Sequence, residues 1–158
     1  MSVLRHAALA ATLVTASFAA FAQTTVQDPW VRGTVAQQKA TGMFARITSA
    51  QGGKLVSVSS PVAGVVEVHE MAMEGNVMKM RAMPSLDLPA GKAVELKPGG
   101  YHVMLMDLKQ QATPGLVVPV TLVVETPGGK RESIEVKAPV RPLTSGAEKS
   151  DDHKGHKH

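Results

Sequence analysis

Two segments of the chain pair a histidine with a methionine, and together they indicate a site for a soft metal ion. His69 and Met80 lie in the run HEMAMEGNVMKM, and His102 and Met104 lie in the run HVM. The chain has six histidines, nine methionines and no cysteine, so such a site would contain no thiolate. Imidazole suits copper and thioether sulfur favours its monovalent ion, whereas zinc prefers Cys, His or carboxylate ligands. Copper(I) is therefore the leading candidate.

Strand alternation places these side chains on faces that can meet solvent. His102 and Met104 are two residues apart, so on a strand they project from one face, roughly 7 Å apart. On the strand predicted at residues 65–71, His69 shares a face with Glu67, and Val66 and Val68 lie on the opposite face. We therefore expect exposed ligands at one end of the fold, a position that favours ligand exchange with another protein.

Short strands separated by Gly, Pro and Asp residues make up the rest of the chain, and long helical periodicity is absent from its sequence. The predicted strands are residues 26–32, 41–49, 54–59, 65–71, 77–81, 93–97, 101–108, 117–125 and 131–137. Many short strands at this spacing are typical of an all-β sandwich with Greek-key connections. With aromatic residues at only 3%, aliphatic side chains and methionine must fill its core.

The two ends of the chain differ from this central domain, which we place at residues 23–143. Residues 1–22 predict a cleavable signal peptide, because Arg5 precedes an apolar run that ends in the small-residue site Ala20-Phe21-Ala22. This run is too short to span a bilayer, so we expect no membrane span. In an oxidising compartment, thioether ligands survive where a thiol could be lost to disulfide exchange.

The tail, residues 144–158, is polar and predicts a disordered extension. His153, His156 and His158 give it nitrogen donors, so we expect a possible second site, for copper(II), there. Loss of a copper(II) EPR signal on truncation after Leu143 would test that site. The net charge of +4 comes from scattered basic residues, which argues against binding to nucleic acid.

At this point two segments carry a family resemblance: LPAGKAVELKPGGYHVMLMDLKQ and HEMAMEGNVMKMR. They resemble the periplasmic copper chaperone family PCu(A)C, whose pattern His-x10-Met-x21-His-x-Met is matched at His69, Met80, His102 and Met104. The resemblance implies a cupredoxin-like, immunoglobulin-like β-sandwich and copper(I) on those four side chains. It also implies a periplasmic location and delivery of copper to the CuA centre of cytochrome c oxidase.

The surroundings of the site, the acceptor and the oligomeric state can also be predicted. Met71, Met78 and Met106 are expected to pack around the copper rather than bind it, and Glu70 and Glu74 are candidates for hydrogen bonds to the imidazoles. The acceptor is the CuA domain or another copper-transfer protein such as a Sco-type chaperone, and the chain is expected to be a monomer.

Other functional classes compete with a copper chaperone. General periplasmic copper buffering, without a dedicated acceptor, would use the same ligands. A blue-copper electron carrier requires a cysteine thiolate, which the chain lacks. No Ser-His-Asp or paired-carboxylate pattern indicates a hydrolase, so we expect no enzyme activity. The remaining alternative is an immunoglobulin-like binding module with incidental His and Met residues.

Overall fold

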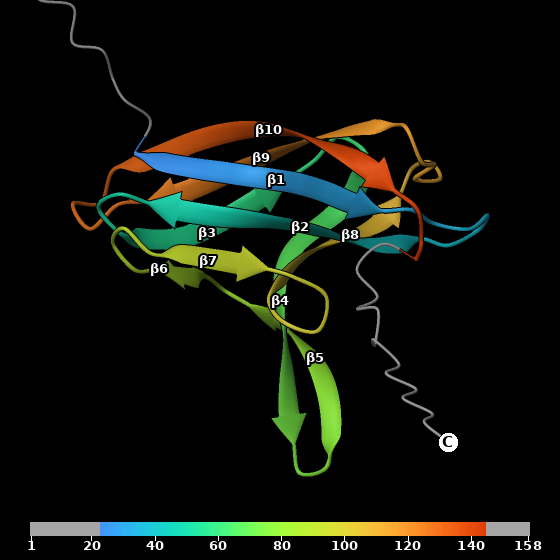
Figure 1. Ribbon diagram of the computed structural model, residues 1–158, viewed down its shortest axis with the longest axis horizontal. Coiled ribbons are helices and arrows are strands. Elements are labelled where there is room, and N and C mark those ends of the chain that lie inside the picture. Colours follow the sequence, from blue (N-terminus) through green and yellow to red (C-terminus); the bar gives the residue numbers. More distant parts are fainter. Residues whose placement is uncertain (1–22, 145–158) are drawn as a thin grey trace, which may run out of the picture.

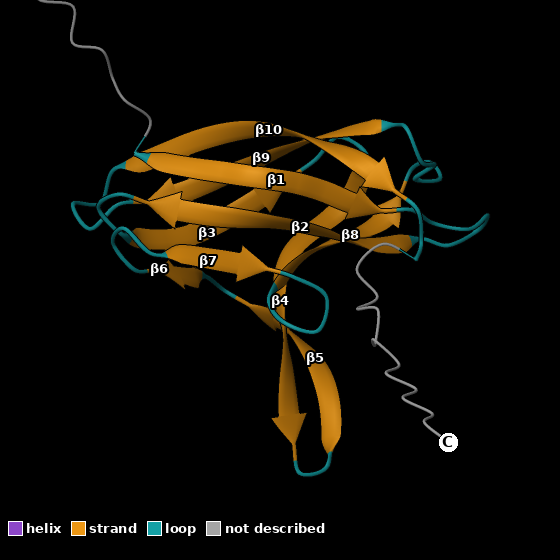
Figure 2. Cartoon of the chain, viewed as in Figure 1, coloured by secondary structure: helices purple, strands orange, loops and turns teal. Residues whose placement is uncertain are grey.

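The computed structural model describes residues 23–144, which form an all-β domain (Figures 1 and 2). Its strands are β1 (Thr24–Arg32), β2 (Ala40–Ser49), β3 (Gly53–Ser59), β4 (Ala63–Glu74), β5 (Val77–Met83), β6 (Leu86–Leu88), β7 (Ala93–Leu96), β8 (His102–Leu108), β9 (Val117–Glu125) and β10 (Arg131–Arg141). The predicted all-β class is confirmed. The described part of the chain holds no helix long and apolar enough to cross a bilayer.

The strands form one continuous mixed sheet in the order β5-β4-β8-β2-β1-β10-β9-β3-β6, with β7 paired to β2 beside β8. β1 and β10 run parallel, and the other described pairs are antiparallel. The sheet folds over itself, so that strands early in this order face strands late in it (Figure 1). Because of this folding, one face of the sheet becomes the inside of the domain and the other becomes its outside.

Successive residues along each strand point alternately to the inside and to the outside of the domain. In β8, Val103 and Leu105 are fully buried, and they lie opposite Val68 and Val66 of β4. These side chains join one apolar cluster of Val, Leu, Ile, Ala and Met residues contributed by both layers. Aliphatic side chains thus fill the core, as the low aromatic content predicts, and the intervening residues of β4 and β8 are left on the outer face.

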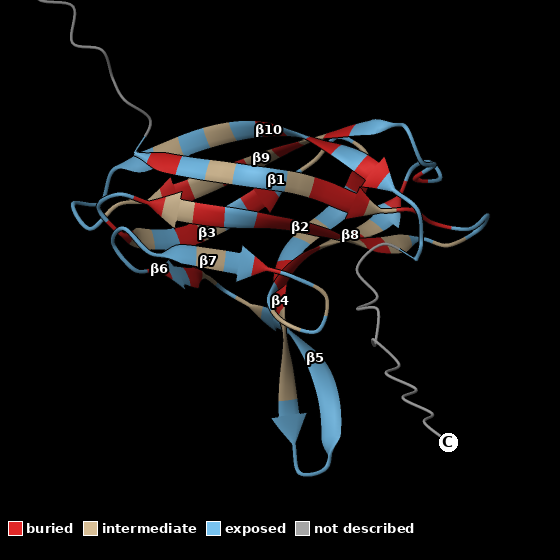
Figure 3. Cartoon of the chain, in the orientation of Figure 1, coloured by how far each residue is buried: buried red, intermediate tan, exposed pale blue. Residues whose placement is uncertain are grey.

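The fold differs from the sequence prediction in β10, which ends at Arg141 rather than at residue 137, and in two further places. β6 was not predicted, because its three residues, which lie between Pro84 and Pro89, are too few to establish an alternating pattern. β4 and β5 each extend beyond their predicted ends, to Glu74 and Met83, and form a hairpin that projects away from the sandwich (Figures 1 and 3). This hairpin carries Met80 into the region of the two histidines.

Candidate metal centre

The register of β4 against β8 brings the two histidines together. His69 lies directly opposite His102, and the centroids of their rings are 5.9 Å apart. Both side chains are on the outer face, since their neighbours Val68 and Val103 form a pair on the core side. Two residues distant in sequence therefore become cross-strand partners through the pairing of the strands.

Hydrogen bonding fixes which nitrogen of His102 is free. Its Nδ1 is 3.0 Å from the carbonyl oxygen of Gly100, and a carbonyl only accepts, so Nδ1 carries the proton. In the neutral ring Nε2 then presents a lone pair, and this nitrogen is 3.1 Å from the Sδ of Met80. Two lone-pair donors thus point toward one another, an arrangement that a bound soft cation would stabilise.

His69 is oriented in a similar way by Glu67, which lies two residues before it on the same face of β4. Its Nε2 is 2.9 Å from a carboxylate oxygen of Glu67, so in the neutral ring Nε2 donates and Nδ1 keeps a lone pair. That Nδ1 is buried and has no hydrogen-bond partner. A buried, unpaired nitrogen carries a desolvation cost, which a metal ion could relieve.

Met80 and Met104 come to this region from different strands. Met80 lies in β5, opposite Met71 of β4, and Met104 lies in β8, opposite Gly42 of β2. Gly42 has no room for a larger residue, because a Cβ there would come within 2.8 Å of the Phe44 ring. The residue opposite Met104 therefore has no side chain, and space remains on the outer face of the sheet.

These side chains border a depression of about 290 Å³. Its lining is Arg32, Gln38, Ala40, Thr41, Gly42, Phe44, Met71, Met80, Pro98, Gly99, His102 and Met104. His69 is absent from that lining, although its ring adjoins that of His102. The structure thus brings all four predicted ligands to one face, with three of them at the depression and His69 beside it.

The chain from residue 24 to residue 140 matches the family model described as putative lipoprotein LpqE-like. It belongs to the LpqE-like family. One curated relative is the putative lipoprotein Lxx21020 of Leifsonia xyli subsp. xyli, which is 31% identical over 100 residues. That match covers 61% of this chain and only 59% of the relative's length.

Solved structures similar to this LpqE-like chain include PCuAC domains. The apo PCuAC domain of PmoF1 is 25% identical, with a TM-score of 0.62, and the match covers 77% of this chain and 95% of that domain. The copper(I) form of DR1885 from Deinococcus radiodurans is 29% identical, with a TM-score of 0.60 over 78% of this chain and 81% of that one. The cupredoxin-like and immunoglobulin-like sandwich expected from the sequence is thereby confirmed.

Burial of the imidazoles differs from the expectation of exposed histidines. His69 is only 8% exposed and His102 only 6%, although both lie on the outer face. The Phe44 ring, 6.4 Å from that of His102, and the segment before β8 cover positions that alternation alone leaves open. Met80, by contrast, is 48% exposed. Among the predicted ligands of the LpqE-like chain, the thioether of Met80 is therefore far more exposed than either imidazole.

The surroundings of His102 favour its neutral form. Burial lowers the pKa of His102 below its usual 6.5, and the nearby His69 and Arg32 lower this pKa further. The hydrogen bond to the Gly100 carbonyl opposes them by raising the pKa, but burial is the largest effect. A neutral imidazole is the form that binds a metal, so the lowered pKa keeps Nε2 available at mildly acidic pH.

The residues expected to surround the copper lie in different parts of the structure. Met71 lines the depression, Met78 lies further along the hairpin, and Met106 faces Ala40 and Val65 outside the depression. Glu70 and Glu74 form ion pairs with Arg81 and Lys79, and Glu67 is the carboxylate that meets an imidazole. The two-residue spacing of Glu67 and His69 could have identified this contact.

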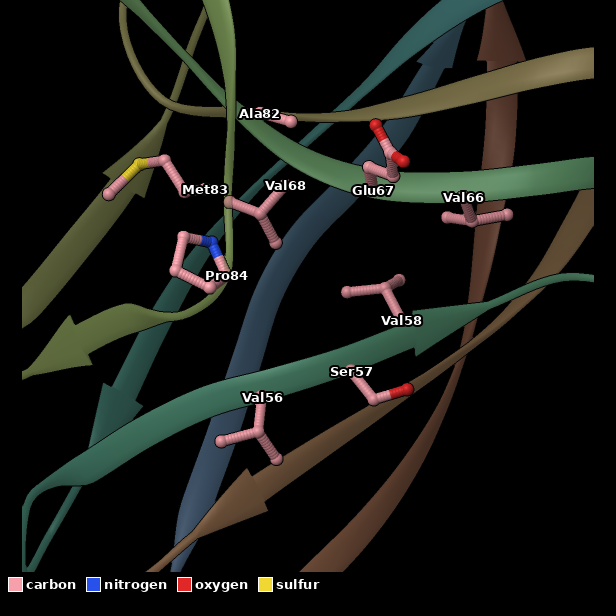
Figure 4. A pocket seen from close by; sticks show the side chains of 9 residues that line it. All are labelled: Val56, Ser57, Val58, Val66, Glu67, Val68, Ala82, Met83 and Pro84. Carbon is pink, nitrogen blue, oxygen red and sulfur yellow. The ribbon is translucent and has the colours of Figure 1, made fainter.

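Elsewhere the described residues offer no metal site built from imidazole and carboxylate ligands. Between residues 23 and 144, no three His, Asp or Glu side chains gather closely enough to hold a metal. A larger depression of about 350 Å³ lies between β3, β4 and the end of β5, lined by residues 56–58, 66–68 and 82–84 (Figure 4). Its lining includes Ser57, Glu67 and Met83 but no histidine. The predicted signal peptide and the tail histidines, His153, His156 and His158, lie outside the described residues.

Proposed function

We propose that this chain is a periplasmic copper chaperone that binds copper(I) through His69, Met80, His102 and Met104. The observation that carries this proposal is the approach of the His102 Nε2 to the Met80 Sδ, at 3.1 Å, while Nδ1 is held by Gly100. Two nitrogen and two thioether donors carry no charge, which suits a monovalent soft cation better than copper(II).

The distribution of exposure supports transfer by ligand exchange. The imidazoles are buried, whereas Met80 is exposed on a projecting hairpin. An acceptor's sulfur or nitrogen can therefore replace the Met80 thioether first, while the two histidines still hold the ion. Copper would pass to the acceptor in this way without being released to water, and its oxidation state would stay the same.

The similarity to DR1885, whose solved form contains copper(I), supports the choice of metal. Membership of a family described as lipoprotein-like agrees with export, and residues 1–22 are proposed to be the signal peptide. The proposed acceptor is the CuA domain of cytochrome c oxidase or a Sco-type chaperone. Copper(II) binding by His153, His156 and His158 is proposed as a separate property of the tail.

Anaerobic transfer to a purified CuA domain tests the chaperone proposal. We expect the copper(I)-loaded chain to lose its metal to the acceptor, and metal analysis after separating the two proteins measures this. A chain truncated after Leu143 provides the control for the tail, and it should transfer copper equally well. Retention of copper by the loaded chain, with a competent acceptor in excess, would favour the alternative of general copper buffering.

The pH dependence of copper(I) affinity should follow the neutral state of His102. Because its pKa lies below the usual 6.5, protons compete with copper at Nε2 only below that pH, and affinity then falls as pH falls. Competition titrations between pH 7.5 and pH 5, corrected for protonation of the chelator, measure this. A His102→Ala variant whose affinity, although lower, falls with pH along the same profile as that of the unmodified chain would contradict the role of this nitrogen.

A further inference from the structure

The projecting β4–β5 hairpin carries four methionines on a single face. Met71 lies directly opposite Met80, and Met73 lies directly opposite Met78. All four alternate in phase with His69, so they continue the outer face of the candidate metal centre toward the hairpin tip. Figure 1 shows how far this hairpin extends from the sandwich. We call these four residues the methionine ladder.

Packing does not account for the outer half of this ladder. Met73 is 63% exposed and Met78 is 48% exposed, and neither belongs to the apolar core. The end of the hairpin is coloured as exposed in Figure 3. Methionine usually fills gaps in a core, so two paired methionines in solvent call for another explanation.

The opposite face of the hairpin has a different composition. There Glu70 pairs with Arg81, and Glu74 pairs with Lys79 at 2.7 Å. One face of the hairpin is therefore charged. On the other face, the residues between His69 and the hairpin tip are all methionines. Such a separation of chemistries on a two-stranded hairpin, which has no core of its own, indicates that the thioether face binds something.

The spacing of the ladder suits a small soft ion. Directly opposite residues on antiparallel strands have Cβ atoms about 5 Å apart, and successive residues on one face are roughly 7 Å apart. Methionine has three rotatable bonds beyond its Cα, so the sulfurs of Met71, Met73 and Met78 can converge on one point. Thioether sulfur is a ligand that selects copper(I) over harder ions.

We propose that Met71, Met73 and Met78 form a second, thioether-only copper(I) site at the outer end of the hairpin, from which the ion passes to and from the site at His69 and His102. This inference rests on the proposed copper function and adds a route to it. Met80 faces both sites, because it pairs with Met71 on one side and contacts His102 on the other. The outer site binds more weakly, since it lacks the oriented imidazoles.

The test compares the full chain with a Met73→Leu/Met78→Leu double variant, using copper(I) under anaerobic conditions. Leucine keeps the apolar surface and removes the sulfur. In the unmodified chain, the methyl NMR signals of Met73 and Met78 should shift as a second equivalent is added. In the variant, we expect this binding to weaken, and release of the first equivalent to a small chelator to slow, each on the order of tenfold.

Met106→Leu serves as the matched control, because Met106 is on the outer face of β8 but outside the hairpin. Unchanged binding and release in the double variant would overturn the proposal and assign the exposed methionines to apolar contact with a partner. Shifts of the Met73 and Met78 signals in a chain whose histidines bind no copper would uphold the outer site and refute the proposed main site. The two proposals can therefore fail separately.

Discussion

Replacing Met80 and Met104 together by leucine should remove tight copper(I) binding and leave the domain folded. The change eliminates two of the four proposed donors while nearly conserving side-chain volume. Loss of a partner that merely orients a ligand costs about 10- to 100-fold in metal affinity, so loss of two ligands should exceed about 100-fold. Neither side chain belongs to the apolar core, and the free energy of unfolding should change by less than about 1.5 kcal/mol.

Anaerobic titration against a copper(I) chelator measures the affinity, and urea unfolding measures the stability. Met106→Leu is again the control, since Met106 is on the same strand and face as Met104 but does not line the depression. It should bind copper(I) like the unmodified chain. Wild-type affinity in the double variant would show that these thioethers are not ligands.

Leu105→Ala should destabilise the domain and leave the proposed copper(I) ligands intact. Leu105 follows Met104 in β8, points into the core and is fully buried. Removing its side chain should lower the free energy of unfolding by about 2–5 kcal/mol, through lost apolar contact and the cavity left behind. A domain of this size has a total stability of about 5–15 kcal/mol, so the variant should unfold at a markedly lower urea concentration.

Copper(I) should restore part of that loss in the Leu105→Ala variant. A bound ion at 100 times its dissociation constant stabilises the folded state by about 2.7 kcal/mol. The proposed copper ligands are on the outer face, so this substitution leaves them in place. Val65→Ala is the exposed control on the paired strand and should change stability by less than about 0.5 kcal/mol. Comparable destabilisation by the two substitutions would contradict the division of β8 into a core face and a metal face.

Alternation predicted the faces of β4 and β8 correctly, because it depends only on the order of residues within a strand. It could not predict that His102 is buried, since Phe44 and the segment before β8 approach it from other parts of the chain. Nor could it predict the burial of His69, whose ring lies beside that of His102 on another strand. The cross-strand contact of the two rings also depends on the order of strands in the sheet, which local patterns leave undetermined.

The methionine ladder, by contrast, could have been derived from the sequence. Gly75 and Asn76 form a two-residue turn between β4 and β5, and such a turn fixes the register of the hairpin. Counting outward from it pairs Met73 with Met78 and then Met71 with Met80. The strand predicted at residues 65–71 ended before Met73, so the exposed Met73 lay outside the predicted strands.

The parallel pairing of β1 with β10 has a consequence for how the protein reaches its folded state. These are the first and last strands of the part of the chain that the structure describes, and β10 fills the position between β1 and β9. Until the final strand is synthesised, both neighbours expose an unpaired edge, and unpaired edges favour association with other chains. The sheet can therefore close only once β10 is available, and contacts between segments so distant in sequence form slowly. A nascent or truncated chain lacking β10 would need protection from aggregation.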